Sequence, residues 1–228
     1  MMDMMDMMAS EVKIKICGLS RQEDLNLCVR SKVDFVGFIF ALESPRAVTP
    51  SAAARLESQD VERVGVFVNR PVEEILSVVR EARLDRVQLH GREPLPQVRA
   101  IAHAIGAERV VKVFWPLAEG LEGLEGLEEL EREMALYADS AACFLFDGGR
   151  DGGGQGQVLP LKVLRLLKEK SPRPFFVAGG LGPENAAELA EKITPFGLDL
   201  NSALESAPGK KDPAKVIKAL EAIRRIKK

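Results

Sequence analysis

The chain has 228 residues, of which 46% are hydrophobic and 29% are charged, enough apolar material for one large core. Its formal net charge of −2 excludes the overall positive charge that is typical of proteins that bind nucleic acids or anionic membranes. No apolar run reaches the roughly 18 residues needed to span a bilayer. Residues 1–10 carry acids and no basic segment, so we expect a disordered tail rather than a secretion signal, followed by one catalytic domain over 11–228.

The cysteines indicate a reducing compartment. Cys17, Cys28 and Cys143 are odd in number, widely spaced and free of any C-x-x-C pair. This pattern disfavours both a disulfide framework and a zinc site. We therefore expect a cytoplasmic protein that uses no metal.

In chain order, strands and helices are expected to alternate. Apolar runs rich in β-branched and aromatic residues predict eight strands, over 12–17, 33–40, 61–68, 86–90, 109–115, 143–147, 174–180 and 197–202. Segments of helical periodicity predict eight helices, near 20–31, 50–59, 71–82, 93–105, 121–138, 160–170, 182–193 and 213–227. The first helix has a start signal, Ser20 followed by Glu23, whose side chains can bond backbone N–H groups that a helix leaves unpaired.

This alternation predicts the fold class. Runs such as V-G-F-I-F are apolar on both faces, as a parallel sheet covered by helices requires. Eight βα units in succession favour a single closed (β/α)₈ TIM barrel over an open doubly wound sheet. No G-x-G-x-x-G follows the first strand, so the usual sign of a dinucleotide fold is missing.

In such a barrel the chemistry lies at the C-terminal ends of the strands and in the loops that follow them. The polar and glycine residues found there are Cys17, Ser44, Arg46, Asn69, His90, Asp147, Gly179, Gly180, Asn201 and Ser202. They combine a thiol, a carboxylate and an arginine with permissive backbone. This set is typical of an acid and a base beside an anion site.

Each of these residues also has an ordinary structural interpretation. Cysteine is among the most buried residue types, so Cys17 could be a small apolar filler, as we expect of the other two cysteines. Asp147 could open a turn with the glycines that follow it. His90 could be a hydrogen-bonded barrel residue, and Arg46 could form an ion pair at the surface.

Glycine-rich loops after the sixth and seventh strands favour an anion ligand. The first reads D-G-G-R-D-G-G-G-Q-G, and so much permissive backbone lets N–H groups approach a ligand or lets a loop close. The second, A-G-G-L-G-P-E-N, places bare backbone beside a helix N-terminus, an arrangement that binds phosphate. Loops after strands seven and eight are the habitual phosphate site of this barrel.

Several motifs together resemble one enzyme family. The series K-I-C-G-L, S-P-R-A-V, G-V-F-V-N, V-Q-L-H-G, F-D-G-G, G-G-Q-G, A-G-G-L-x-P-E-N, G-L-D-L-N-S-A-L-E and P-G-K-K-D is similar to phosphoribosylanthranilate isomerase, in order over residues 13–212. The resemblance implies a (β/α)₈ barrel that converts N-(5′-phosphoribosyl)anthranilate to 1-(o-carboxyphenylamino)-1-deoxyribulose 5-phosphate. This Amadori rearrangement belongs to tryptophan biosynthesis and uses no metal or organic cofactor.

The resemblance also implies roles for individual residues. Asp147 becomes the general acid and Cys17 the general base, while Arg46 binds the anthranilate carboxylate. His90 and Asp199 line the substrate. The phosphate is expected on backbone N–H groups of Gly153, Gly154, Gly179, Gly180, Ser202 and Ala203.

These roles set expectations for two pKa values. An acid near neutral pH needs a pKa above the usual value of about 3.9, and burial would raise that of Asp147. Cys17 needs a pKa below about 8.5, which positive charge or a helix N-terminus would provide.

Three departures from the family pattern concern binding rather than proton transfer. Gln155 replaces a threonine, Leu159–Leu161 replaces F-D-W, and Ala203 replaces a glycine. The loop after the sixth predicted strand is therefore expected to close differently. Because alanine does not take positive φ cheaply, the phosphate contact at Ala203 should use ordinary backbone or be altered.

Two rival functions stay open at this point. One is a histidine-pathway sugar isomerase, which would have an aspartate where Cys17 stands. The other is a catalytically silent phosphate-binding module or a subunit of a tryptophan-pathway complex. We expect a small phosphosugar as the partner, no nucleic acid or membrane, and a monomer or homodimer.

Overall fold

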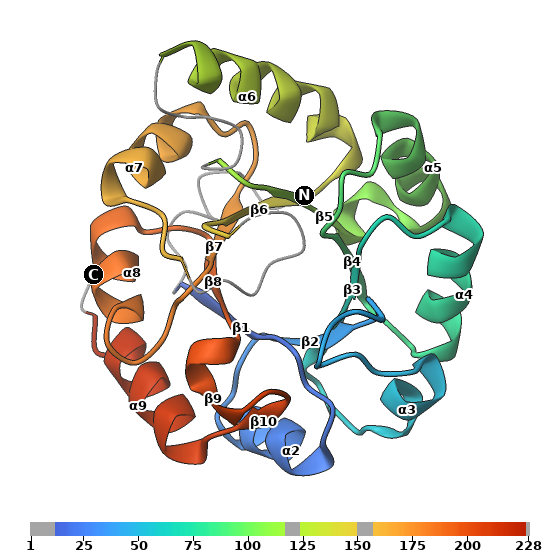
Figure 1. Cartoon of the computed structure of the whole chain (residues 1–228), viewed down its shortest axis with the longest axis vertical. Coiled ribbons are helices and arrows are strands. Elements are labelled where there is room, and N and C mark those ends of the chain that lie inside the picture. Colours follow the sequence, from blue (N-terminus) through green and yellow to red (C-terminus); the bar gives the residue numbers. More distant parts are fainter. Residues whose placement is uncertain (1–11, 117–123, 150–156, 227–228) are drawn as a thin grey trace.

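The protein forms a closed barrel of parallel strands. A computed structural model describes residues 12–116, 124–149 and 157–226 (Figure 1). The strands follow one another around the barrel in chain order, and β1 closes the ring by pairing with β8. They are β1 Lys13–Ile16, β2 Phe35–Ile39, β3 Glu62–Phe67, β4 Arg86–Leu89, β5 Val110–Phe114, β6 Cys143–Asp147, β7 Phe175–Ala178 and β8 Gly197–Leu200. The predicted fold class is thus confirmed.

Helices surround the barrel, one after each strand (Figure 1). Within the described ranges they are α2 Gln22–Arg30, α3 Pro50–Arg55, α4 Val72–Glu81, α5 Leu95–Ile105, α6 Leu124–Tyr137, α7 Leu161–Lys170, α8 Ala186–Ile193 and α9 Pro213–Arg224. Short 3₁₀ helices, η1 Ala107–Arg109, η2 Ala138–Ser140 and η3 Ser202–Leu204, lie in the connections. No helix in these parts of the chain is long and apolar enough to cross a membrane. The predicted tail, residues 1–10, lies outside the described residues.

Alternation along each strand divides the core into two layers. In β5, Val111 and Val113 point into the barrel and pack with Phe35, Leu145 and Phe176. Residues of the opposite parity, such as Val110 and Phe114, pack against the surrounding helices in the larger outer core. Since successive strand side chains point to opposite faces, every strand here must be apolar on both sides. Polar residues on the inner face therefore stand out as exceptions.

The predicted start of the first helix is wrong. α2 begins at Gln22, and its N-cap residue Arg21 makes no side-chain capping bond. The Ser20 hydroxyl instead donates to the carbonyl oxygen of Gly209, 3.3 Å away. A partner 189 residues distant thus replaces the local one that the motif suggested. Thr49 and Asp212 do cap α3 and α9 through their side chains.

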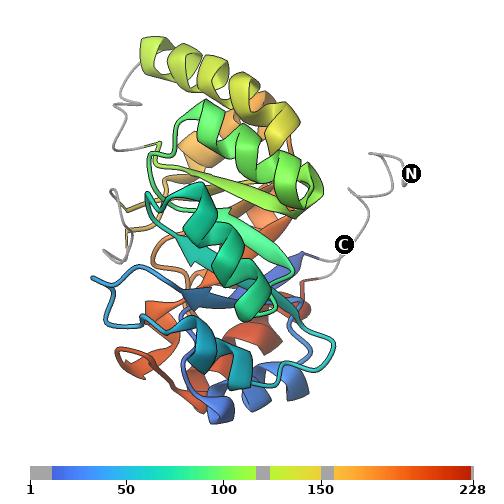
Figure 2. The ribbon, with the colours of Figure 1, turned by 90° about the vertical axis from the view of Figure 1, so that its right-hand side faces the viewer.

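A small hairpin not predicted from the sequence follows β8. Strands β9 Glu205–Ala207 and β10 Lys210–Lys211 pair antiparallel, separately from the barrel. In the side view of Figure 2 this orange-red hairpin projects at the same end of the barrel as the blue loop after β2. That end is where the strands terminate, so the hairpin brings Glu205 and Lys211 to the functional end.

Candidate active site

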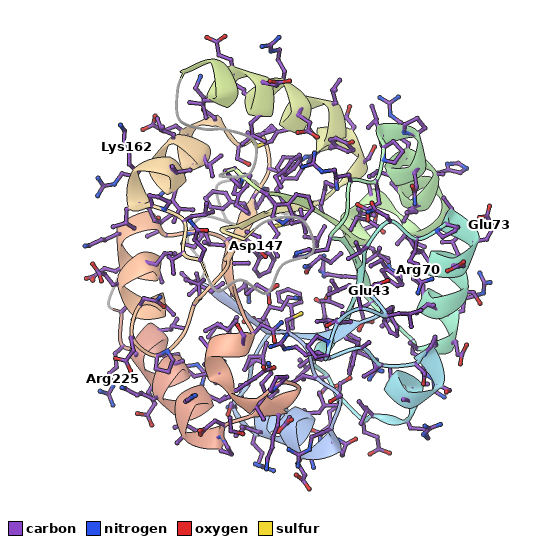
Figure 3. The ribbon with its side chains drawn as sticks, in the orientation of Figure 1. Glu43, Arg70, Glu73, Asp147, Lys162 and Arg225 are labelled. Atoms are coloured by element: carbon purple, nitrogen blue, oxygen red, sulfur yellow. The ribbon has the colours of Figure 1, made fainter. Side chains whose placement is uncertain are left out.

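A pocket opens at the C-terminal ends of β1, β6, β7 and β8. Figure 3 places Asp147 near the centre of the barrel, whereas Lys162 and Arg225 project from the outer helices. The lining residues are Cys17, Arg46, Asp147, Ala178, Gly179, Gly180, Leu181, Asp199, Asn201, Ser202 and Ala203. Nine of these are residues that the sequence singled out, and His90 contacts one of them. Gly153 and Gly154 lie outside the described residues.

Cys17 directly follows β1, and its backbone N–H donates to the carbonyl of Leu200 on β8. Its side chain is buried at the pocket wall. Burial raises the pKa of the Cys17 thiol, and the nearby Lys15 ammonium opposes this without cancelling it. The expected lowering of this pKa is therefore wrong, because desolvation of the thiolate outweighs the positive charge.

Lys15 precedes Cys17 by two residues, so both side chains point into the barrel. Its Nζ lies 2.7 Å from Oδ2 of Asp199, and both side chains are more than 90% buried. β1 and β8 place these two residues opposite each other in register. The second oxygen of Asp199, Oδ1, is buried with no hydrogen-bond partner among the described residues.

Asp147 is the last residue of β6, with one oxygen fixed and the other facing a histidine. Oδ1 accepts the N–H of Gly149 at 2.8 Å, and Oδ2 lies 3.5 Å from Nε2 of His90. Burial raises the pKa of Asp147, but His90, the Gly149 N–H and Lys15 together hold it below its usual range. The expected elevation is thus wrong here, because bonds and charges that favour the carboxylate exceed the desolvation effect.

His90 is oriented from inside the barrel. Nε2 of Gln88 lies 2.9 Å from its Nδ1, and the Trp115 ring packs edge-on against the imidazole. With the Gln88 amide donating to Nδ1, a neutral ring carries its proton on Nε2, the atom that faces Asp147. The imidazole is therefore placed to donate toward the carboxylate or toward a ligand between them.

Arg46 is engaged by a carboxylate of the hairpin. Its Nε and Nη2 bond the two oxygens of Glu205 at 2.7–3.1 Å. Glu205 also accepts from Nζ of Lys211, which in turn bonds the Asn201 side chain. The fork of Arg46 is thus held at the pocket by an ion-pair network that includes both hairpin strands.

Two glycines after β7 and the first residues of η3 after β8 also line the pocket. Gly179 and Gly180 have φ of +94° and +60°, which L-residues rarely adopt. A Cβ at Gly179 would lie 2.9 Å from Oδ1 of Asp147 and 2.4 Å from the carbonyl oxygen of Gln157. Ser202 and Ala203 begin η3, so Ala203 needs no left-handed conformation there. The backbone of both loops can therefore approach the pocket without a side chain at residues 179 and 180.

The departures noted in the sequence fall partly within the described residues. Leu159 is buried in the outer core, and Leu161 begins α7. Gln155 lies outside the described residues. Among the described residues, no group of three or more His, Cys, Asp or Glu side chains is arranged to hold a metal ion.

Comparison with known proteins agrees with this geometry. The family model described as N-(5′-phosphoribosyl)anthranilate (PRA) isomerase matches residues 14–222. The chain belongs to this family. It is an isomerase of tryptophan biosynthesis that performs the Amadori rearrangement of phosphoribosylanthranilate.

Individual relatives of this isomerase cover nearly all of the chain. The N-(5′-phosphoribosyl)anthranilate isomerase of Desulfovibrio desulfuricans is 44% identical over 91% of this chain and 93% of its own length. A crystal structure of phosphoribosyl anthranilate isomerase with reduced 1-(o-carboxyphenylamino)-1-deoxyribulose 5-phosphate has a TM-score of 0.78 and 30% identity, covering 94% and 100%. Monomers generated from the dimeric enzyme of Thermotoga maritima give 0.75 and 31%, with the same coverage.

Several residues that bond His90 or the pocket-lining side chains were not singled out by sequence reasoning. Lys15 and Gln88 lie on inner faces of strands, and Glu205 and Lys211 come from the hairpin. A signal existed for Lys15, because K-I-K-I-C puts it in the same inward parity as Cys17. Glu205 and Lys211 stand within family motifs, but those motifs assigned no role to either residue, and the hairpin strands are only three and two residues long.

Proposed function

We propose that Cys17 and Asp147 carry out the proton transfers of this isomerisation. The observation that supports this is their convergence on one pocket that is also lined by an arginine and by two glycines after β7. Two acid–base groups on either side of a sugar are what the reaction needs, and the neighbouring amides suit a phosphate.

The steps follow from the chemistry of the substrate. Asp147 gives a proton to the ribose ring oxygen, and the C1–O bond breaks as the nitrogen lone pair forms a protonated Schiff base. The Cys17 thiolate then removes the proton from C2, and that electron pair forms the C1–C2 double bond of an enolamine. Tautomerisation, with a proton gained at C1 and lost from the 2-hydroxyl, gives the ketone product.

Substrate binding must supply the protonated form of Asp147. The unliganded carboxyl has a lowered pKa. A substrate with a carboxylate and a phosphate brings negative charge and excludes water from the pocket, and both changes raise the pKa of a neighbouring carboxyl. Asp147 therefore becomes an acid in the complex rather than in the free protein.

The remaining groups bind the two ends of the substrate. Arg46 binds the anthranilate carboxylate through the part of its guanidinium that Glu205 leaves free, while Glu205 bonds Nε and Nη2 and keeps the side chain at the pocket. The open oxygen of Asp199 accepts from a ribose hydroxyl, and His90 contacts the sugar from the opposite side.

The phosphate rests on the amides of Gly179, Gly180, Ser202 and Ala203. Gly153 and Gly154 complete this set in the proposal. The ligand named in the related crystal structure carries both a phosphate and a carboxylate, which supports a site with room for two anionic groups.

Loss of phosphoribosylanthranilate fluorescence tests the catalytic assignment. Cys17→Ser and Asp147→Asn should each lower kcat by at least about 10², because positioned acid–base groups typically contribute 10²–10⁴-fold. Affinity for the product should change little, since neither substitution removes a main binding contact. Unchanged turnover in both variants would refute the proposed roles.

The oligomeric state and the location of the protein also belong to this proposal. A dimeric relative supports a homodimer as one of the two predicted states, and light scattering after size exclusion distinguishes it from a monomer. The cytoplasm stays a prediction from cysteine usage.

A further inference from the structure

The inner face of the barrel contains a buried ammonium beside the proposed base. A Cβ added to Gly37 of β2 would lie 2.7 Å from Sγ of Cys17 and 3.1 Å from Nζ of Lys15. The sulfur and the ammonium therefore adjoin the same small volume, which exists because residue 37 has no side chain. This juxtaposition does not depend on flexible loops, since Lys15 and Gly37 belong to paired strands.

Lys15 is charged in this position despite its burial. Burial lowers the pKa of its ammonium, but Asp199 and Cys17 outweigh that effect and keep the pKa above its ordinary value. Burying a Lys–Asp pair gives little net stability compared with apolar side chains of similar size. The pair therefore points to a role other than holding the barrel together.

The charges around Cys17 come from five elements. Lys15 is on β1, Asp199 on β8, Arg46 in the loop after β2, and Lys211 on β10. Glu205 of β9 bonds both Arg46 and Lys211.

Three cations thus face two carboxylates, which leaves one positive charge unbalanced. Either an ionised Cys17 or an ionised Asp147, which lies beside His90, can balance that charge. The reaction requires the thiolate together with the protonated carboxyl. Arg46 and Lys211 both bond Glu205, whereas Lys15 adjoins the sulfur itself.

We propose that Lys15 is a positioning residue that activates Cys17: held by Asp199 in the space above Gly37, its ammonium stabilises the thiolate that takes the C2 proton. This rests on the proposed role of Cys17. Lys15 itself neither gains nor loses a proton in the step, because the ammonium remains bonded to Asp199.

The test measures thiol ionisation separately from turnover. Alkylation of Cys17 by iodoacetamide, followed by peptide mass spectrometry across pH 6–10, reports the ionisation midpoint in the full-length protein. Lys15→Met should raise this midpoint by about 1 pH unit, which lowers the alkylation rate at pH 7.5 about tenfold. The high-pH limb of the pH profile of kcat/KM should also move to higher pH. We expect kcat to fall about 10–100-fold.

Two variants serve as controls. Lys13→Met removes a lysine from the same strand whose side chain is half-buried and paired with Asp34, so it should leave the midpoint and turnover within about twofold of the parent. Lys15→Arg keeps a cation and should restore much of the shift in midpoint. Melting curves verify that each variant is folded.

If Lys15→Met does not fold, Lys15→Met/Asp199→Asn removes both buried charges and should still raise the midpoint, by less than the single change. A midpoint that is unchanged in the folded variants overturns the role of Lys15, whatever the turnover. Failure of the base assignment is a separate result, because it appears as full turnover in Cys17→Ser.

Discussion

Two lysines on strands of this barrel form buried pairs with carboxylates, and the pairs differ in how many of their hydrogen bonds are made. Lys112 of β5 points outward, and its Nζ bonds Glu93 at 3.0 Å and the carbonyl of Gly91. Both oxygens of Glu93 accept further bonds from the backbone N–H of Gly91, and one also accepts from that of Asn69. The Lys112 ammonium also packs over the rings of Trp115 and Tyr137.

The inward pair of Lys15 and Asp199 is incomplete by comparison. Its carboxylate has one oxygen bonded and one with no hydrogen-bond partner in the described part of the chain. Buried polar atoms are nearly always paired, so an open one at a pocket is expected to be completed by a ligand. The comparison indicates that the closed pair supports the loop after β4, whereas the open pair serves the reaction.

Breaking the closed pair should produce the largest effect on stability. Glu93→Gln keeps the shape of the side chain but leaves the Lys112 ammonium buried without its counter-charge, which typically costs about 3–5 kcal/mol. Urea unfolding at pH 7 measures this loss. A loss below about 1 kcal/mol would contradict the structural role assigned to this pair.

Removing both members of each lysine–carboxylate pair should distinguish the two pairs by their effect on kcat. Lys112→Met/Glu93→Gln should recover part of the stability lost by the single change, because no unpaired charge remains, and should keep kcat within about fivefold of the parent. Lys15→Met/Asp199→Asn should instead lose kcat by about 10², since positioned groups at the reaction contribute on this scale. Equal turnover losses in the two double variants would remove the distinction.

The smallest expected effect concerns the free energy of unfolding at acid pH. The folded pKa of Asp147 lies below its unfolded value of about 3.9, so its contribution is complete above that value and is lost as pH falls through the folded pKa. Asp147→Asn should therefore flatten the fall in unfolding free energy below about pH 4. Urea titrations at pH 5 and pH 3 measure it, and an identical slope in both proteins would show that the carboxylate gains nothing on folding.

Much of this arrangement could be predicted from the sequence, because strands buried on both faces and amphipathic helices leave strong periodic patterns. The rule that chemistry lies at the ends of barrel strands then placed Cys17 and Asp147 among the candidates, and the family resemblance implied their roles. Ser20 was misassigned because a local motif competed with a distant carbonyl of the hairpin. The hairpin itself, with Glu205, was too short to leave a pattern.

The predicted directions of the pKa shifts of Cys17 and Asp147 were wrong for a different reason. Burial and neighbouring charges act in opposite senses on both Cys17 and Asp147, so the sign depends on distances that no sequence pattern contains. Asp147 keeps its charge because Gly149 and His90 are within reach, and Cys17 does not because desolvation dominates. Only the assembled pocket decides which effect is larger.

The pairing of β1 with β8 has a consequence for biosynthesis of the protein. Lys15 and Asp199 are 184 residues apart, and they meet only where the first strand closes on the last. A growing polypeptide therefore displays Cys17 as an ordinary thiol until nearly the whole chain has left the ribosome. A change in the reactivity of the Cys17 thiol therefore marks the pairing of β1 with β8. Measuring that reactivity during cell-free translation would show when the barrel closes.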